Sequence, residues 1–165
     1  MTFQSIIQDI KSGKISPVYL LHGEEPFFID QIEDAIEKNV LTESEKAFDQ
    51  TICYGKDTDV RSLTDLLSKY PMISQRQVVI VREAQELKKI EELAGYIKSP
   101  MKSTVLVLAH KYKKVDGRTQ FAKLAASSGV VFESKPIPDY QIADWIGNLL
   151  RDHKINTTPD VQAVL

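Results

Sequence analysis

Short runs of apolar and β-branched residues recur along the chain and alternate with segments of helical period. Five such runs are present: 17–22, 48–54, 78–81, 104–109 and 130–132. The third and fourth runs are apolar without interruption, which is typical of strands buried on both faces of a parallel sheet. Strand, helix and strand repeated in this order predict an α/β fold with a five-stranded parallel sheet flanked by helices on both faces.

The segments around these runs carry apolar residues three and four positions apart, the spacing of one helix face. An amphipathic helix over 3–10 is expected before the first strand. Further helical patterns cover 28–36, 60–67, 87–97 and 121–125. We therefore expect one helix in each of the four connections between consecutive strands.

The composition changes at 135–138, where two prolines predict an extended linker, because each disfavours helix at the residue before it. An amphipathic helix over 140–150 follows, and Thr157-Thr158-Pro159-Asp160 supplies an N-cap with proline at the first helical position. We expect two domains, 1–135 as the α/β domain and 136–165 as the start of a small helical domain. Because the last helix has barely begun when the sequence stops, we also expect a piece of a larger protein.

Composition and charge exclude several classes of protein. Apolar residues make up 42% of the chain and charged residues 27%, and the net charge of −2 provides no general attraction to nucleic acid or anionic membranes. No apolar run approaches the ~20 residues that span a bilayer. The N-terminus lacks the features of a signal peptide, and the single cysteine, Cys53, has no partner for an internal disulfide. A cytoplasmic protein without membrane contact is expected.

The turn after the first strand occupies the place where nucleotide-binding α/β proteins keep their phosphate loop. A phosphate loop needs several glycines, a lysine for the outer phosphates and a hydroxyl for magnesium. Here the turn has one glycine, Gly23, followed by Glu24, Glu25 and Pro26. Two carboxylates repel a phosphate, and the proline removes an N–H donor. The turn predicts a degenerate nucleotide site.

The end of the third strand points the same way. In active ATPases of this kind an acidic residue there holds magnesium, whereas Arg82 occupies the position here. A guanidinium repels a metal ion. We therefore expect no metal and no cofactor.

Other reactive or charged groups favour structural roles. His22 and His110 both follow strands, and strand-end histidines with backbone partners are favoured over a metal pair, since no cysteine or well-spaced carboxylate completes one. The basic loop from Lys111 to Arg118 is a candidate for a weak DNA contact, but a solvated loop is favoured. Cys53 is expected to be a strand residue and not a nucleophile.

Four segments resemble the delta subunit of the bacterial DNA polymerase III clamp loader. They are 18–27, 75–82, 130–133 and 144–146. The resemblance implies a P-loop-NTPase-like domain of the AAA+/RecA type in degenerate form, then a helical second domain. It also implies a subunit of the polymerase holoenzyme without activity of its own, which binds and opens the sliding clamp without hydrolysing ATP. Other clamp-loader subunits would bind through a C-terminal collar domain that lies outside this sequence.

The candidate clamp-binding element is the connection from the helix that begins at Asp59 to the third strand. That helix is expected to end at Lys69-Tyr70, because Pro71 disfavours helix before it. Met72 and Ile73, flanked by Pro71 and Ser74, are then two adjacent apolar side chains in a surface connection. The resemblance implies that such a pair enters a hydrophobic pocket on the clamp.

Two other functions stay open at this point. One is an active AAA+ ATPase, against which the missing lysine and missing strand-end acid argue. The other is a flavodoxin-like enzyme that binds a small phosphorylated ligand at the same edge of the sheet, because a fold does not fix a function.

Overall fold

The computed structural model describes residues 2–138 and 141–152 of the chain. It divides into two compact units, Met1–Ser134 and Lys135–Leu165. In the second unit the described helix is α7, Ile142–Asp152, on which Ile146 is buried. The helix expected from Thr157 lies outside the described residues.

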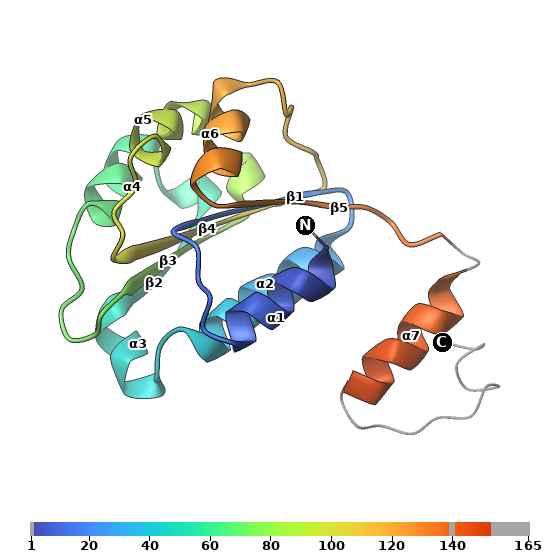
Figure 1. The fold of residues 1–165 in the computed structure, drawn as a ribbon. Helices are drawn as coiled ribbons and strands as arrows, with labels where there is room; N and C mark the ends of the chain where they lie inside the picture. Colours follow the sequence, from blue (N-terminus) through green and yellow to red (C-terminus); the bar gives the residue numbers. More distant parts are fainter. Residues whose placement is uncertain (1, 139–140, 153–165) are drawn as a thin grey trace. The chain divides into compact units, whose positions relative to one another are not determined.

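The first unit is built on the expected sheet of five parallel strands (Figure 1). They are β1 Val18–Gly23, β2 Gln50–Tyr54, β3 Gln77–Arg82, β4 Thr104–Lys111 and β5 Val130–Ser134. The order β2-β3-β4-β1-β5 makes β2 and β5 the edges of the sheet. In the central strands β1, β3 and β4 nearly every residue is buried, as their unbroken apolar runs predict.

Helices cover both faces of the sheet, which confirms the predicted layers (Figure 1). The first face carries α1 Phe3–Lys11 and α2 Pro26–Asn39, and α3 Glu43–Asp49 leads into β2. The opposite face carries α4 Val60–Leu67, α5 Ala94–Ile97 and α6 Gln120–Ser128. The connection after β1 runs to one face and the connection after β4 to the other, so the neighbouring ends of β1 and β4 mark a topological switch point.

One predicted helix is wrong in its form. The pattern over 87–97 suggested a continuous helix, but the chain forms two short 3₁₀ turns, Ala84–Glu86 and Ile90–Leu93, before α5. Lys89 takes a left-handed backbone conformation with φ of 56°, which no α-helix tolerates. Leu87, Leu93 and Ile97 are buried all the same, and Ile90 and Ala94 pack partly buried against the core, so the apolar spacing reports the buried face and not the hydrogen-bond pattern.

The second strand, β2, begins two residues later than predicted. Phe48 and Asp49 close α3, a helix that the predicted strand 48–54 overlooks, and β2 begins at Gln50. A capping box starts α3: the Thr42 hydroxyl accepts from the Glu45 N–H, and the Glu45 carboxylate accepts from the Thr42 N–H.

Helix α4 begins after Asp59, whose side chain caps it, but ends at Leu67 and not at Lys69-Tyr70. The side chain of Gln77, the first residue of β3, donates to the carbonyls of Leu66 and Lys69 at 3.1 and 2.7 Å. This amide satisfies carbonyl groups that a helix end leaves without partners. Helix α4 therefore ends where the side chain of Gln77 caps its last carbonyl groups, three residues before Tyr70, at which Pro71 would end it.

Candidate functional site

The turn after β1 is held against β5 by close backbone contact. Gly23 has φ of +130°, and a Cβ built there would lie 2.2 Å from the carbonyl oxygen of Ser134. The Ser134 hydroxyl donates to the Glu25 carbonyl at 2.6 Å. Only glycine fits at position 23, because a side chain there would collide with the backbone of β5.

Three backbone donors in and beside this turn are used within the protein. The Gly23 N–H donates to the Lys113 carbonyl, and the Glu25 N–H donates to the Ser134 carbonyl. The Phe27 N–H donates to the Glu25 carboxylate at 3.0 Å, so Glu25 is the N-cap of α2. A phosphate at this helix start would compete with a carboxylate that already occupies the N–H group.

Arg82 ends β3 with its guanidinium directed to α2. Its Nε donates to the Glu33 carboxylate at 2.8 Å, and Nη2 donates to Glu37 at 3.4 Å. The hydrogen bond to Glu33 raises the pKa of Arg82 above its ordinary value. Burial raises the pKa of Glu33, and the pairing with Arg82 opposes this rise. Arg82 thus balances the buried carboxylate of Glu33.

The surface beside this ion pair is strongly acidic. A hollow of about 530 Å³ lies there at the carboxyl ends of β2, β3 and β4. Five carboxylates line it: Asp30, Glu33, Asp34, Glu37 and Glu83. Two cations, Arg82 and Lys111, share the lining, and both are engaged in ion pairs. The hollow thus carries more negative than positive charge.

His22 and His110 lie side by side across the β1–β4 pairing and hold the loop that follows β4. The Val115 N–H donates to Nδ1 of His22 at 2.9 Å, and Nδ1 of His110 lies 3.0 Å from the Lys113 carbonyl. Burial lowers the pKa of both imidazoles. Both histidines therefore have the backbone partners that were favoured over a metal pair.

We expect the stability of the protein to fall as the pH drops below the ordinary histidine pKa of 6.5. Because the folded pKa of His22 is lowered, the unfolded chain binds its proton first, and acid favours unfolding in this window. Protonation at Nδ1 would also remove the acceptor of the Val115 N–H. Thermal unfolding at pH 7.5 and 5.5 measures the effect, and His22→Gln should reduce the difference between the two. An unchanged difference would show that His22 is not responsible.

The basic loop after β4 is only partly free. Lys111 pairs with Asp30 of α2, and Arg118 pairs with Asp116 inside the loop. Lys113 and Lys114 are exposed, as is Tyr112. A contact of this loop with DNA stays a prediction.

Within the part of the chain that the structure describes, no group of three or more potential metal ligands is found. The thiol of Cys53 is half-buried and donates to the Ile80 carbonyl at 3.7 Å. Burial raises the pKa of this thiol, which disfavours the reactive thiolate. Among the same residues, no helix is long and apolar enough to cross a membrane.

The loop of residues 70–75, hereafter the anchor loop, lies at the opposite edge of the sheet, where β3 begins (green, left in Figure 1). Met72 is 73% exposed and Ile73 is 56% exposed. Neither side chain therefore covers the core beneath the loop. Tyr70 in the same loop is 77% exposed, so three large side chains face solvent within four residues.

One buried carboxylate holds the backbone of the anchor loop. Asp49, the last residue of α3, accepts hydrogen bonds from the N–H groups of Met72, Ile73 and Ser74. The Ser74 hydroxyl lies 2.6 Å from the same carboxylate and 2.6 Å from the Arg76 carbonyl, and its single proton serves one of them at a time. The loop is thus fixed at its backbone while its apolar side chains stay outside.

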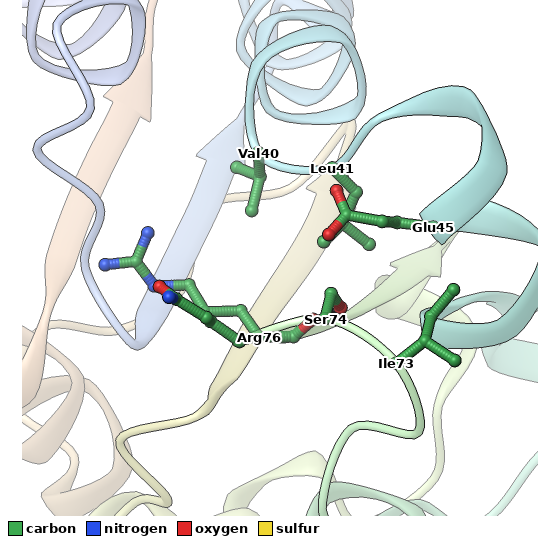
Figure 2. A pocket seen from close by; sticks show the side chains of 7 residues that line it. Val40, Leu41, Glu45, Ile73, Ser74 and Arg76 are labelled. Atoms are coloured by element: carbon green, nitrogen blue, oxygen red, sulfur yellow. Dashed lines mark hydrogen bonds between the residues drawn. The ribbon is translucent and has the colours of Figure 1, made fainter.

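A hollow of about 370 Å³ lies beside the anchor loop (Figure 2). Ile73, Ser74 and Arg76 line it from the loop and the start of β3, and Glu45 lines it from α3. Val40 and Leu41 add an apolar wall. Ile73 therefore stands at the border of a depression and not on a flat surface.

Sequence reasoning placed Met72 and Ile73 in a surface loop but missed Asp49, which was assigned to a strand. The signal was present: Thr42 followed three residues later by Glu45 is the pattern of a capping box. That pattern predicts α3 and moves Asp49 to its end. The contact with a loop 23 residues further on has no local signal.

Comparisons with known proteins agree on one family. A profile described as DNA polymerase III, delta subunit, matches residues 19–135. The DNA polymerase III subunit delta of Bacillus subtilis is 26% identical over 154 residues, which cover 87% of this chain and 44% of that protein. The chain therefore spans less than half of that relative.

Solved structures show the same fold. The DNA clamp loader delta protein of Bacillus subtilis has a TM-score of 0.81 at 21% identity, over 98% of this chain and 50% of that one. A DNA polymerase III gamma subunit-related protein of Thermotoga maritima has a TM-score of 0.56 at 16% identity, over 92% of this chain and 52% of that one. The expected α/β fold of AAA+ type is confirmed.

Proposed function

Because this chain belongs to the family of DNA polymerase III delta subunits, we propose that it binds a sliding clamp and helps to open it without hydrolysing ATP. The family also implies other clamp-loader subunits as partners. The chain spans about half the length of the relatives it matches.

The anchor loop is the observation that carries the clamp-binding proposal. Adjacent apolar side chains that stay exposed on a fixed backbone are the kind of anchor that fills a partner's pocket. They lie at the amino edge of the sheet, whereas ligands of such folds bind at the carboxyl edge. Met72 and Ile73 therefore serve a different purpose from a nucleotide site, and a protein surface is the partner that suits them.

The carboxyl edge supports the second half of the proposal. The N–H groups of Gly23 and Glu25 in the turn are engaged within the protein, and Arg82 occupies the place of a magnesium-binding acid. The acidic hollow above them disfavours a triphosphate, because like charges repel. An active ATPase or a flavodoxin-like enzyme would need the anion to displace these contacts.

The test is a pair of titrations on the whole chain. We expect measurable binding to the sliding clamp of the source organism. The affinity should be the same without nucleotide and with magnesium-ATP at about 1 mM. Calorimetry with ATP alone should give no heat of binding. Absence of clamp binding would contradict the first half of the proposal, and micromolar ATP affinity would contradict the second.

A further inference from the structure

Met72 and Ile73, hereafter the anchor pair, stand on a loop whose backbone N–H groups donate to the buried carboxylate of Asp49. We propose that Asp49 is a positioning residue for clamp binding, whose carboxylate holds the anchor loop in the form that presents Met72 and Ile73. This inference rests on the proposed function and adds to it. Asp49 belongs to a different element, α3, and is only 4% exposed.

The geometry is that of a backbone anion cradle. The Met72 N–H donates to Oδ1 of Asp49, and the N–H groups of Ile73 and Ser74 donate to Oδ2 at 2.9 and 2.7 Å. Three consecutive N–H groups converge on one anion only when the chain curves around it. The carboxylate therefore defines the curvature of the loop at the two residues whose side chains point outward.

Little else holds the anchor loop. Among the described residues, no backbone–backbone hydrogen bond outside the helices and strands involves residues 70–75. The side chains of Tyr70, Met72 and Ile73 are exposed and add little packing. Pro71 restricts its own φ but leaves the following residues free. The shape of the loop thus rests chiefly on the contacts with Asp49.

The charge of Asp49 is needed for this role, and the neighbouring donors preserve it. Burial raises the pKa of Asp49, but hydrogen bonds from the Ser74 hydroxyl and the three N–H groups outweigh it and lower the pKa to about 2. The group is therefore ionised at neutral pH and accepts at both oxygens. An asparagine has one acceptor oxygen, and its amide would turn N–H donors toward the N–H donors of the loop.

A fixed loop improves binding because the cost of ordering it has been met during folding. An anchor loop without this carboxylate would sample several shapes, and the clamp would have to select one of them. The expected result of Asp49→Asn is a loss of clamp affinity of roughly tenfold, although Asp49 is itself buried.

Two readouts test the inference. The first is hydrogen exchange of the free protein: in Asp49→Asn the amides of residues 72–74 should exchange faster, while the amides of β1 and β4 keep their protection. The second is clamp affinity in a double-mutant cycle with Met72→Ala/Ile73→Ala. If Asp49 acts through the anchor pair, Asp49→Asn should cost almost nothing further in the variant that lacks the pair.

The matched control is Asp116→Asn, since Asp116 is also a loop carboxylate that accepts from a backbone N–H, but it lies at the opposite edge of the sheet. It should change neither the exchange at residues 72–74 nor clamp affinity. Should Asp49→Asn fail to fold, Ser74→Ala removes only the hydroxyl from the cradle and should produce the same changes at smaller size.

The outcomes separate this inference from the function on which it rests. If the Met72→Ala/Ile73→Ala variant loses clamp affinity while Asp49→Asn and Ser74→Ala bind normally, the inference is wrong and the proposed function stands. Additive losses in the cycle would also overturn it, because they show an effect independent of the anchor pair. If the unaltered chain does not bind a clamp, the proposed function fails and this inference fails with it.

Discussion

Replacing Met72 and Ile73 together by alanine is expected to weaken clamp binding by at least roughly 30-fold, about 2 kcal/mol, the usual threshold of an interface hot spot. Both side chains are more than half exposed, so a partner's pocket can bury surface that folding leaves in water. The flexible, polarizable chain of Met72 suits a pocket that adapts to it. Surface plasmon resonance against the immobilised clamp gives the affinities.

The stability of the same variant separates an anchor from a core residue. Because the two side chains are exposed, the free energy of unfolding should change by no more than about 0.5 kcal/mol. Tyr112→Ala is the matched control: Tyr112 is 62% exposed, but it lies at the opposite edge of the sheet and should leave clamp affinity unchanged. A variant that unfolds at lower temperature while its folded fraction binds the clamp normally would show that the site lies elsewhere.

Gly23→Ala is expected to destabilise the protein by at least about 4 kcal/mol, which lowers the melting temperature by roughly 10 °C or more. Two costs combine at this position. The φ of +130° is one that side-chain-bearing residues rarely adopt, and the new Cβ would lie 2.2 Å from the Ser134 carbonyl oxygen. The new Cβ would be bonded directly to the backbone of residue 23, and the oxygen belongs to the backbone of Ser134. Because the two residues are paired between β1 and β5, neither atom can move away at low energetic cost.

Two other glycines separate the cost of the positive φ from the cost of the steric contact. Gly13 also has a positive φ, +87°, but nothing lies within 4 Å of its Cβ position, so Gly13→Ala should cost only about 1 kcal/mol. Gly95 has an ordinary helical conformation and open space, and Gly95→Ala should stabilise α5 by roughly 0.5–1 kcal/mol. Thermal unfolding followed by circular dichroism ranks the three. Equal melting temperatures for Gly13→Ala and Gly23→Ala would contradict the role assigned to the Ser134 contact.

The parallel sheet was predictable because its central strands are buried on both faces and must be apolar throughout. Each of the five runs became a strand, and four of the strands begin within one residue of the predicted start. β2 begins two residues late, and the predicted strand therefore concealed the end of α3. The predicted helix over 87–97 failed for a different reason. Apolar spacing records which side chains face the core, and Leu87 and Leu93 are buried here although the segment forms no continuous helix.

The candidate site, too, was predictable from the sequence only in part. The turn is judged by its residue types, so a degenerate nucleotide site at Glu24, Glu25, Pro26 and Arg82 could be proposed without a structure. The partners of Arg82 could not, because Glu33 and Glu37 lie on a helix more than forty residues earlier in the chain. Which of the charged groups balance one another depends on distance in space.

The sequence by itself determined the five strands in their order along the chain, the lack of a glycine-rich turn with a lysine after the first strand, and the presence of two apolar residues in a connection after Pro71. These are local properties of residue type and spacing. Only the tertiary structure decided that the two residues are exposed and that Asp49 holds their backbone. A buried carboxylate accepts hydrogen bonds from N–H groups that the fold leaves without other partners. Here the tertiary structure brings the end of α3 beside the anchor loop, and no pattern along the chain indicates that contact.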